Sequence, residues 1–140
     1  MFVNKTNLKI LNLSQNYVGE NVLNSAYPDQ VLKYLEGLEE LSIVGVRFPT
    51  LGQGFAYLKM LRRLSFGRQC YCFLLEVCKD TFHYVPQITD LSLMSCKIGC
   101  IDKDAFAPLQ NLNFLNLACN PIGLQEAIES VVVLKNSSIH

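Results

Sequence analysis

The chain has 140 residues, of which half are hydrophobic, and its 12 basic side chains balance its 12 acidic ones. A neutral chain has no electrostatic footprint for nucleic acid or for an anionic membrane surface. Its length allows one domain with a hydrophobic core, and no run approaches the roughly 18 apolar residues of a membrane span.

Five short apolar patterns of the form L-x-x-L-x-L follow one another along the chain. They start at Leu8, Leu38, Leu61, Ile88 and Leu112, so the intervals between starts are unequal and the first is the longest. Alternating apolar side chains are typical of a strand that turns one face toward a core. The patterns therefore predict five strands, near residues 10–14, 40–44, 63–67, 90–94 and 114–118.

A second apolar pattern leads into each strand after the first. Apolar residues stand six and three positions ahead of the start, as Phe55 and Leu58 do before Leu61. A spacing of three predicts a helical or 3₁₀ return segment behind the strands. Because one strand with its return segment cannot bury its own apolar edge, we expect these units to stack into a solenoid.

These patterns resemble the leucine-rich repeat family, whose consensus is L-x-x-L-x-L-x-x-N-x-I. Residues 8–18, "LKILNLSQNYV", and 112–122, "LNFLNLACNPI", carry it in full. The resemblance implies an α/β fold: a solenoid with a curved parallel β-sheet on the concave face, and short helices, 3₁₀ turns and loops on the convex side. A single array of about five repeats would span residues 1–140, and we expect it to be truncated at both ends.

One position of the family consensus holds Asn or Cys, whose side chain satisfies the backbone of the turn after the strand. The residues at this ladder position are Asn16, Val46, Gln69, Cys96 and Asn120. Val46 has no side-chain hydrogen-bonding group, so we expect an irregular turn around it. The other four are expected to form a structural ladder, with Cys96 as a buried free thiol.

The branch of the family is indicated by residues 100–122, "CIDKDAFAPLQNLNFLNLACNPI". Their I-x-x-x-x-A-F-x-x-L-x-x-L form is typical of extracellular repeats, and the irregular repeat lengths are similar to those of Toll-like receptor ectodomains. The resemblance implies a non-catalytic segment of an innate immune pattern-recognition receptor, on the extracellular side of a single-pass membrane receptor. Such a segment would bind a protein or microbial ligand on its concave or lateral face and take part in receptor dimerisation.

Two other functions fit the same fold. One is that of a secreted leucine-rich repeat adhesion or matrix protein. The other is that of a cytosolic leucine-rich repeat scaffold for protein interactions. In all three cases the charge indicates no nucleic acid as a partner, and no membrane contact is expected within this segment.

Signals for catalysis, a cofactor or a metal are poor, and none of the three is expected. The stretch "GQGFAY" begins like a dinucleotide-binding turn but has Tyr57 where the third glycine should stand. With only His83 and His140, no catalytic constellation can be assembled. The spacing C-x-C-x5-C-x4-H, from Cys70 to His83, is not that of a zinc finger, so disulfides are favoured there.

Four of the six cysteines are candidates for disulfides. Counted from the repeat starts, Cys72 and Cys100 take positions 12 and 13 of adjacent repeats. Neighbouring strands lie about 4.8 Å apart, within the Cα separation that a disulfide needs. We therefore expect a bridge from Cys72 to Cys100 and a second from Cys70 to Cys78. The alternative is that all six cysteines are reduced in a cytosolic protein.

Three asparagines stand in N-x-S/T glycosylation sequons, at positions 4, 12 and 136. Asn12 would lie on the strand face that is expected to meet a ligand, where a glycan would block binding. Asn4 and Asn136 are therefore the better candidates.

Outward residues of the predicted strands become neighbours in a parallel sheet. Glu40, Arg63 and Asp90 would form one row, and Lys9, Glu39 and Arg62 another. The preferred interpretation is that these alternating charges support one another. The functional alternative is a polar ligand surface with an apolar contact, made of Arg62, Arg63, Arg68, Asp90, Phe114 and Asn116.

Overall fold

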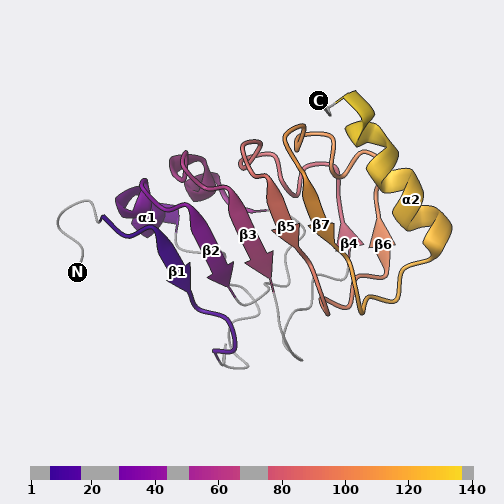
Figure 1. The fold of residues 1–140 in the computed structure, drawn as a ribbon, viewed down its shortest axis with the longest axis horizontal. Coiled ribbons are helices and arrows are strands. Elements are labelled where there is room, and N and C mark those ends of the chain that lie inside the picture. The colour runs from indigo at the N-terminus through magenta and orange to yellow at the C-terminus, as the bar shows by residue number, and fades with distance from the viewer. Residues whose placement is uncertain (1–6, 17–28, 44–50, 67–75, 137–140) are drawn as a thin grey trace.

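Five parallel strands in sequence order form the main sheet of the protein, within a mixed α/β fold (Figure 1). Each strand begins at the residue that the sequence predicts, which confirms the five strands and their order. The computed structural model describes residues 7–16, 29–43, 51–66 and 76–136. The strands are β1 (Ile10–Asn12), β2 (Glu40–Ile43), β3 (Arg63–Phe66), β5 (Asp90–Ser92) and β7 (Phe114–Asn116).

Several of these strands are short because the chain turns soon after they start. In β1 and β7 the side-chain oxygen of the last residue, Asn12 or Asn116, accepts the backbone N–H two residues later, at 3.0 Å. The third residue beyond β1, β5 and β7 has a positive φ: 64° at Gln15, 58° at Ser95 and 60° at Cys119. This left-handed residue ends the strand and redirects the chain toward the return segment.

The five strands are paired in phase, so equivalent residues of neighbouring strands are Cα partners. The inward row consists of Leu11, Leu41, Leu64, Leu91 and Leu115. The three central leucines are at most 2% exposed, whereas the two outer ones are only partly buried. Full burial of such a side chain stabilises the fold by about 1.5–3 kcal/mol, so each of the three central strands depends on both of its neighbours.

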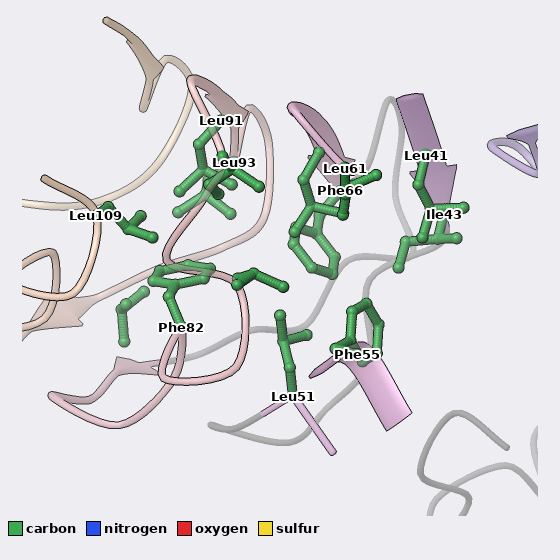
Figure 2. Packing of buried hydrophobic residues seen from close by; sticks show 14 of the residues in the cluster. Leu41, Ile43, Leu51, Phe55, Leu61, Phe66, Phe82, Leu91, Leu93 and Leu109 are labelled. Atoms are coloured by element: carbon green, nitrogen blue, oxygen red, sulfur yellow. The ribbon is translucent and has the colours of Figure 1, made fainter. Parts of the chain in front are cut away.

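The return segments supply the other half of the core. Phe55, Phe82 and Phe106 come from three successive return segments, and all three are fully buried. The rings of Phe82 and Phe106 stack with their centroids 5.9 Å apart. Figure 2 shows Phe55 and Phe82 facing strand residues such as Ile43 and Leu91 across the core. The apolar pattern ahead of each strand therefore marks core residues, as predicted.

The predicted helical or 3₁₀ character holds for the first two return segments. The two later segments are series of turns, in which a backbone N–H bonds to the carbonyl three residues earlier. Examples are Val85 to Phe82, at 3.1 Å, and Leu109 to Phe106, at 2.9 Å. These bonds keep the three-residue spacing of the apolar side chains. The helices of the first two segments are α1 (Asp29–Leu32), η2 (Lys33–Leu35) and η3 (Gln53–Tyr57).

A second parallel sheet, of β4 (Glu76–Val77) and β6 (Cys100–Ile101), was not predicted, because two-residue strands carry no periodicity. Its register differs from that of the main sheet. In the small sheet Glu76 is the Cα partner of Cys100, and in the main sheet Arg63 is the Cα partner of Asp90. The sequence separation between the two partners is three residues shorter in the small sheet. The three extra residues of this repeat therefore lie between β3 and β4 in the chain.

Helix α2 (Leu124–Val132), followed by η4 (Val133–Asn136), lies beside β6 (Figure 1). The Glu126 carboxylate accepts the Ile101 N–H at 2.6 Å, so the helix satisfies a backbone donor at the edge of the small sheet. Ser130 is fully buried, whereas Leu124 is 78% exposed. The helix thus turns a small polar residue inward and leaves a large apolar one in solvent.

The glycines of "GQGFAY" have a packing role. A Cβ at Gly52 would lie 2.5 Å from the Asp29 carboxylate oxygen, and a Cβ at Gly54 would lie 2.7 Å from the Asp29 carbonyl oxygen. The Gly54 distance is to backbone, which no real Cβ approaches so closely, so α1 can lie this near to η3 only where η3 has no side chain. The motif is therefore explained by helix contact.

We predict that Gly54→Ala lowers the free energy of unfolding by about 1–3 kcal/mol, because α1 must move away from η3. Gly123→Ala is the matched control, since nothing lies within 4 Å of a Cβ there. It should change stability by less than about 0.5 kcal/mol, as reduced freedom of the unfolded chain offsets weaker capping of α2. Urea unfolding of both variants decides the matter, and equal stabilities would contradict the prediction.

Candidate functional site

The open sheet face is the side of the main sheet that the return segments leave uncovered. Here it means the outward residues of the five strands. They form two rows of Cα partners. The first row is Ile10, Glu40, Arg63, Asp90 and Phe114, and the second is Asn12, Ser42, Ser65, Ser92 and Asn116.

The charged centre of the first row is an ion pair between neighbouring strands. Arg63 Nε and Nη2 both lie 2.7 Å from Glu40 Oε2. This hydrogen bond, followed by the Glu40 charge, raises the pKa of Arg63, and the charge of Asp90 adds to the effect. The predicted neighbourhood of Glu40, Arg63 and Asp90 is confirmed, and two of the three charges support each other directly.

Beside the first row, Lys9 and Glu39 form a second ion pair, with Nζ and Oε1 2.9 Å apart. The Lys9 hydrogen bond, together with the Lys9 charge, lowers the pKa of Glu39. Arg62 does not join this pair as a hydrogen-bond partner. Its Nη1 instead donates to the carbonyls of Lys59, at 3.1 Å, and Leu61, at 3.0 Å. Of the three residues in this predicted row, Lys9 and Glu39 therefore form an ion pair, and Arg62 bonds to backbone carbonyls instead.

A shallow hollow of about 200 Å³ lies on the open sheet face, over β2, β3, β5 and β7. It brings together three of the predicted ligand residues, Arg63, Asp90 and Phe114. Arg62 and Asn116 do not line it, and Arg68 lies outside the described residues. The described residues that line it are Glu40, Leu41, Ser42, Arg63, Leu64, Ser65, Asp90, Ser92 and Phe114.

The hydroxyl groups of the hollow stand at outward positions of the predicted strands, but they were not among the ligand residues predicted from the sequence. Ser42, Ser65 and Ser92 are Cα partners on three neighbouring strands. The signal was present, because all three stand at the same position of their repeats, four residues after the starts at 38, 61 and 88. They give the hollow a polar stripe next to its charged row.

Asn120 has the role that the family resemblance implies for the ladder. Its Oδ1 accepts the backbone N–H groups of Cys96, at 2.9 Å, and Ile98, at 3.1 Å. Its Nδ2 donates to the carbonyls of Leu93 and Leu117, each at 2.8 Å. One side chain therefore joins the turns of two adjacent repeats, and it supplies partners to backbone groups that the turns leave unpaired.

The other ladder positions differ from one another. Asn16 Nδ2 donates to the Leu13 carbonyl at 2.9 Å, within its own repeat. Cys96 is fully buried, as predicted, but it is disulfide-bonded. The prediction of a free thiol is wrong, because burial of this side chain did not exclude a bonding partner. Gln69 and Val46 lie outside the described residues.

Both predicted disulfide pairings are wrong. Cys78 and Cys100 are free thiols, so neither a bridge from Cys70 to Cys78 nor one from Cys72 to Cys100 is formed. For the bridge from Cys72 to Cys100, the physical reason is the register of the small sheet. Counting from the repeat starts aligned Cys72 with Cys100, but the residue beside Cys100 is Glu76. Cys70 and Cys72 themselves lie outside the described residues.

The two thiols lie near carboxylates. Burial, followed by the charges of Glu76 and Asp102, raises the pKa of Cys78. A hydrogen bond to Glu126 is the main cause that raises the pKa of Cys100. Both cysteines are thereby kept as thiols over a wider pH range than a free side chain, and this makes them poor nucleophiles at neutral pH.

Among the described residues no group of three or more His, Cys, Asp or Glu side chains could hold a metal ion. His83 contacts the Tyr84 ring edge to face, with centroids 5.0 Å apart. Within the same described ranges no helix is long and apolar enough to cross a membrane. The glycosylation candidate Asn4 and the side chain of Asn136 lie outside the part of the chain that is described.

We predict that Asn120→Ala lowers the free energy of unfolding by about 2–3 kcal/mol, because two part-buried N–H groups lose their acceptor. Asn16→Ala is the matched control at the equivalent position, where the side chain is exposed and makes one described bond. It should cost less than about 1 kcal/mol. Thermal unfolding of both variants tests this, and a smaller loss in the Asn120 variant would refute it.

A third prediction concerns the Cys100 thiol. Glu126→Gln removes the carboxylate that disfavours the thiolate, so the pKa of Cys100 should fall and its alkylation should begin at lower pH. Glu129→Gln, a control on the same helix, leaves that carboxylate in place. The measurement is the iodoacetamide labelling rate at Cys100 against pH, by peptide mass spectrometry. An unchanged profile in Glu126→Gln would speak against the assignment.

No protein-family model matches the chain, and no curated protein matches it either. Function must therefore be inferred from the geometry. The main elements of that geometry are the open sheet face with its hollow, the two ion pairs beside it, and the Asn120 ladder.

Proposed function

We propose that this chain is a leucine-rich repeat solenoid that binds a protein or microbial ligand and catalyses nothing. The observation that carries the proposal is the in-phase pairing of five strands, which gathers equivalent outward residues into rows on one open face. Such rows form a broad surface of regular spacing, well suited to a macromolecular partner. The repeated return segments and the Asn120 ladder support the family assignment.

The more specific proposal is a segment of a receptor ectodomain similar to the Toll-like receptors. It rests on the sequence of residues 100–122 and on the irregular repeat lengths. The disulfide at Cys96 supports the extracellular side of a membrane receptor, since disulfides persist in oxidising compartments. Receptor dimerisation and innate immune recognition belong to the same proposal.

A second candidate is a cytosolic scaffold for protein interactions. The observation in its favour is the set of three free thiols, Cys78, Cys100 and Cys119, two of which are exposed. Exposed thiols are more common where the environment is reducing. The binding surface would be the same open sheet face, and only the compartment of the partner would differ.

A fourth prediction tests this function. Binders are selected from displayed libraries of extracellular domains and of cytosolic proteins, and their affinities are compared between variants. Ser65→Arg places a large cation in the centre of the hollow and should weaken binding about tenfold or more. Gln53→Arg adds the same charge on an exposed site of η3 and should leave affinity unchanged.

The library that yields the binders identifies the compartment of the partner. Binders from the extracellular library that lose affinity with Ser65→Arg support the receptor proposal. Such binders from the cytosolic library would support the scaffold instead. If Ser65→Arg and Gln53→Arg have equal effects on every binder, the open sheet face is not the binding surface and the proposed function fails.

A further inference from the structure

The charged side chains that line the hollow differ in whether they form an ion pair. Arg63 is held by Glu40 through two of its nitrogens, both 2.7 Å from one carboxylate oxygen. A ligand anion that approached Arg63 would have to displace this intramolecular partner. The one cation among the described residues of the hollow is therefore already occupied, which disfavours recognition of an anionic ligand there.

The carboxylate of Asp90 differs from Arg63 in this respect. Its Oδ2 accepts the Thr89 hydroxyl at 2.6 Å, and it belongs to neither of the two ion pairs among the described residues. It lies close enough to Arg63 to raise the pKa of that guanidinium, but outside ion-pair distance. With Glu40 and Arg63 neutralising each other, the described residues that line the hollow keep one uncompensated negative charge, at Asp90.

Phe114 stands directly beside this charge. It is the Cα partner of Asp90 on β7, it is 52% exposed, and it lines the hollow. An exposed aromatic ring next to a free carboxylate is a suitable environment for a cation, which gains from the ring face and from the charge together. Ser65 and Ser92, in the same hollow, offer hydroxyl oxygens as further acceptors for N–H donors.

We infer that the hollow binds the cationic end of an arginine or lysine side chain that a partner protein presents. The inference rests on the proposed binding function and names the chemistry that this part of the face recognises. Asp90 would pair with the cation, Phe114 would lie against it, and the serine hydroxyls would accept its remaining N–H groups. The Glu40–Arg63 pair would form the opposite wall and exclude a second cation from the same space.

The test is an NMR titration of the isotope-labelled chain with three small probes of the same backbone. These are Nα-acetyl-arginine amide, Nα-acetyl-glutamine amide and Nα-acetyl-glutamate amide. The arginine probe should shift the amides of Asp90, Ser92 and Phe114 at millimolar concentration, and the other two should shift them far less. A larger effect of the glutamate probe would overturn the inference, because the hollow would then select an anion.

Variants locate the contact. Asp90→Asn keeps an acceptor for the Thr89 hydroxyl but removes the charge, and it should weaken binding of the arginine probe about fivefold. Phe114→Leu should weaken it about threefold, because the ring face is lost. Asp104→Asn removes an exposed charge from a return segment and should have no effect. Equal affinities for Asp90→Asn and the unaltered chain would refute the inference.

A second measurement separates this inference from the proposed function. In any binder whose affinity depends on Ser65, the arginines and lysines of its interface are replaced by glutamine one at a time. One of these changes should lower affinity for the unaltered chain but not for Asp90→Asn. If no such residue exists, the open sheet face still binds proteins, and only the recognition of a cation is wrong.

Discussion

The structure depends on one constraint, which is that neighbouring strands pair without a shift of register. Leu41, Leu64 and Leu91 are buried because each meets a leucine at the same height on either side. A slip by a single residue would turn these side chains outward and bring charged ones into the core. The same pairing also aligns the outward residues, so core and open sheet face are two consequences of one register.

The register explains why charges on the open face come in pairs. Neighbouring strands lie about 4.8 Å apart, so residues at equal height are obligatory neighbours. Like charges there would repel, and the first row instead alternates, as Glu40, Arg63 and Asp90. Such exposed pairs contribute little to stability, about 0.2–1 kcal/mol each. Their main consequence is electrostatic: the alternation begins and ends on a carboxylate, and the second of these, Asp90, forms no ion pair with another described residue.

The repeats differ in length, and the extra residues lie outside the strands of the main sheet. The main strands keep their phase although the step from β3 to β5 is three positions longer in sequence than the step from β5 to β7. The small sheet shows where the difference lies, since the step from Glu76 to Cys100 equals the shorter of these two. Strand pairing tolerates no insertion, whereas loops tolerate several residues at small entropic cost. The predicted bridge from Cys72 to Cys100 failed at this point, because it carried the register of the main strands over to residues that do not keep it.

The sequence by itself determined the five strands, their order and most of the core, because leucine spacing reports directly which side chains must face inward. It also placed Glu40, Arg63 and Asp90 in one row, since rows follow from repeat positions alone. Only the tertiary structure decided that Arg62 turns to backbone carbonyls, that Cys96 is bonded while Cys100 is free, and that α2 lies beside β6. These outcomes depend on side-chain rotamers and on the paths of segments without periodicity. Leucine spacing carries no information about either. The partners of Arg62 are close in the chain, but its choice between them and the Lys9–Glu39 pair is a matter of rotamer, whereas the other outcomes depend on partners that are distant in sequence.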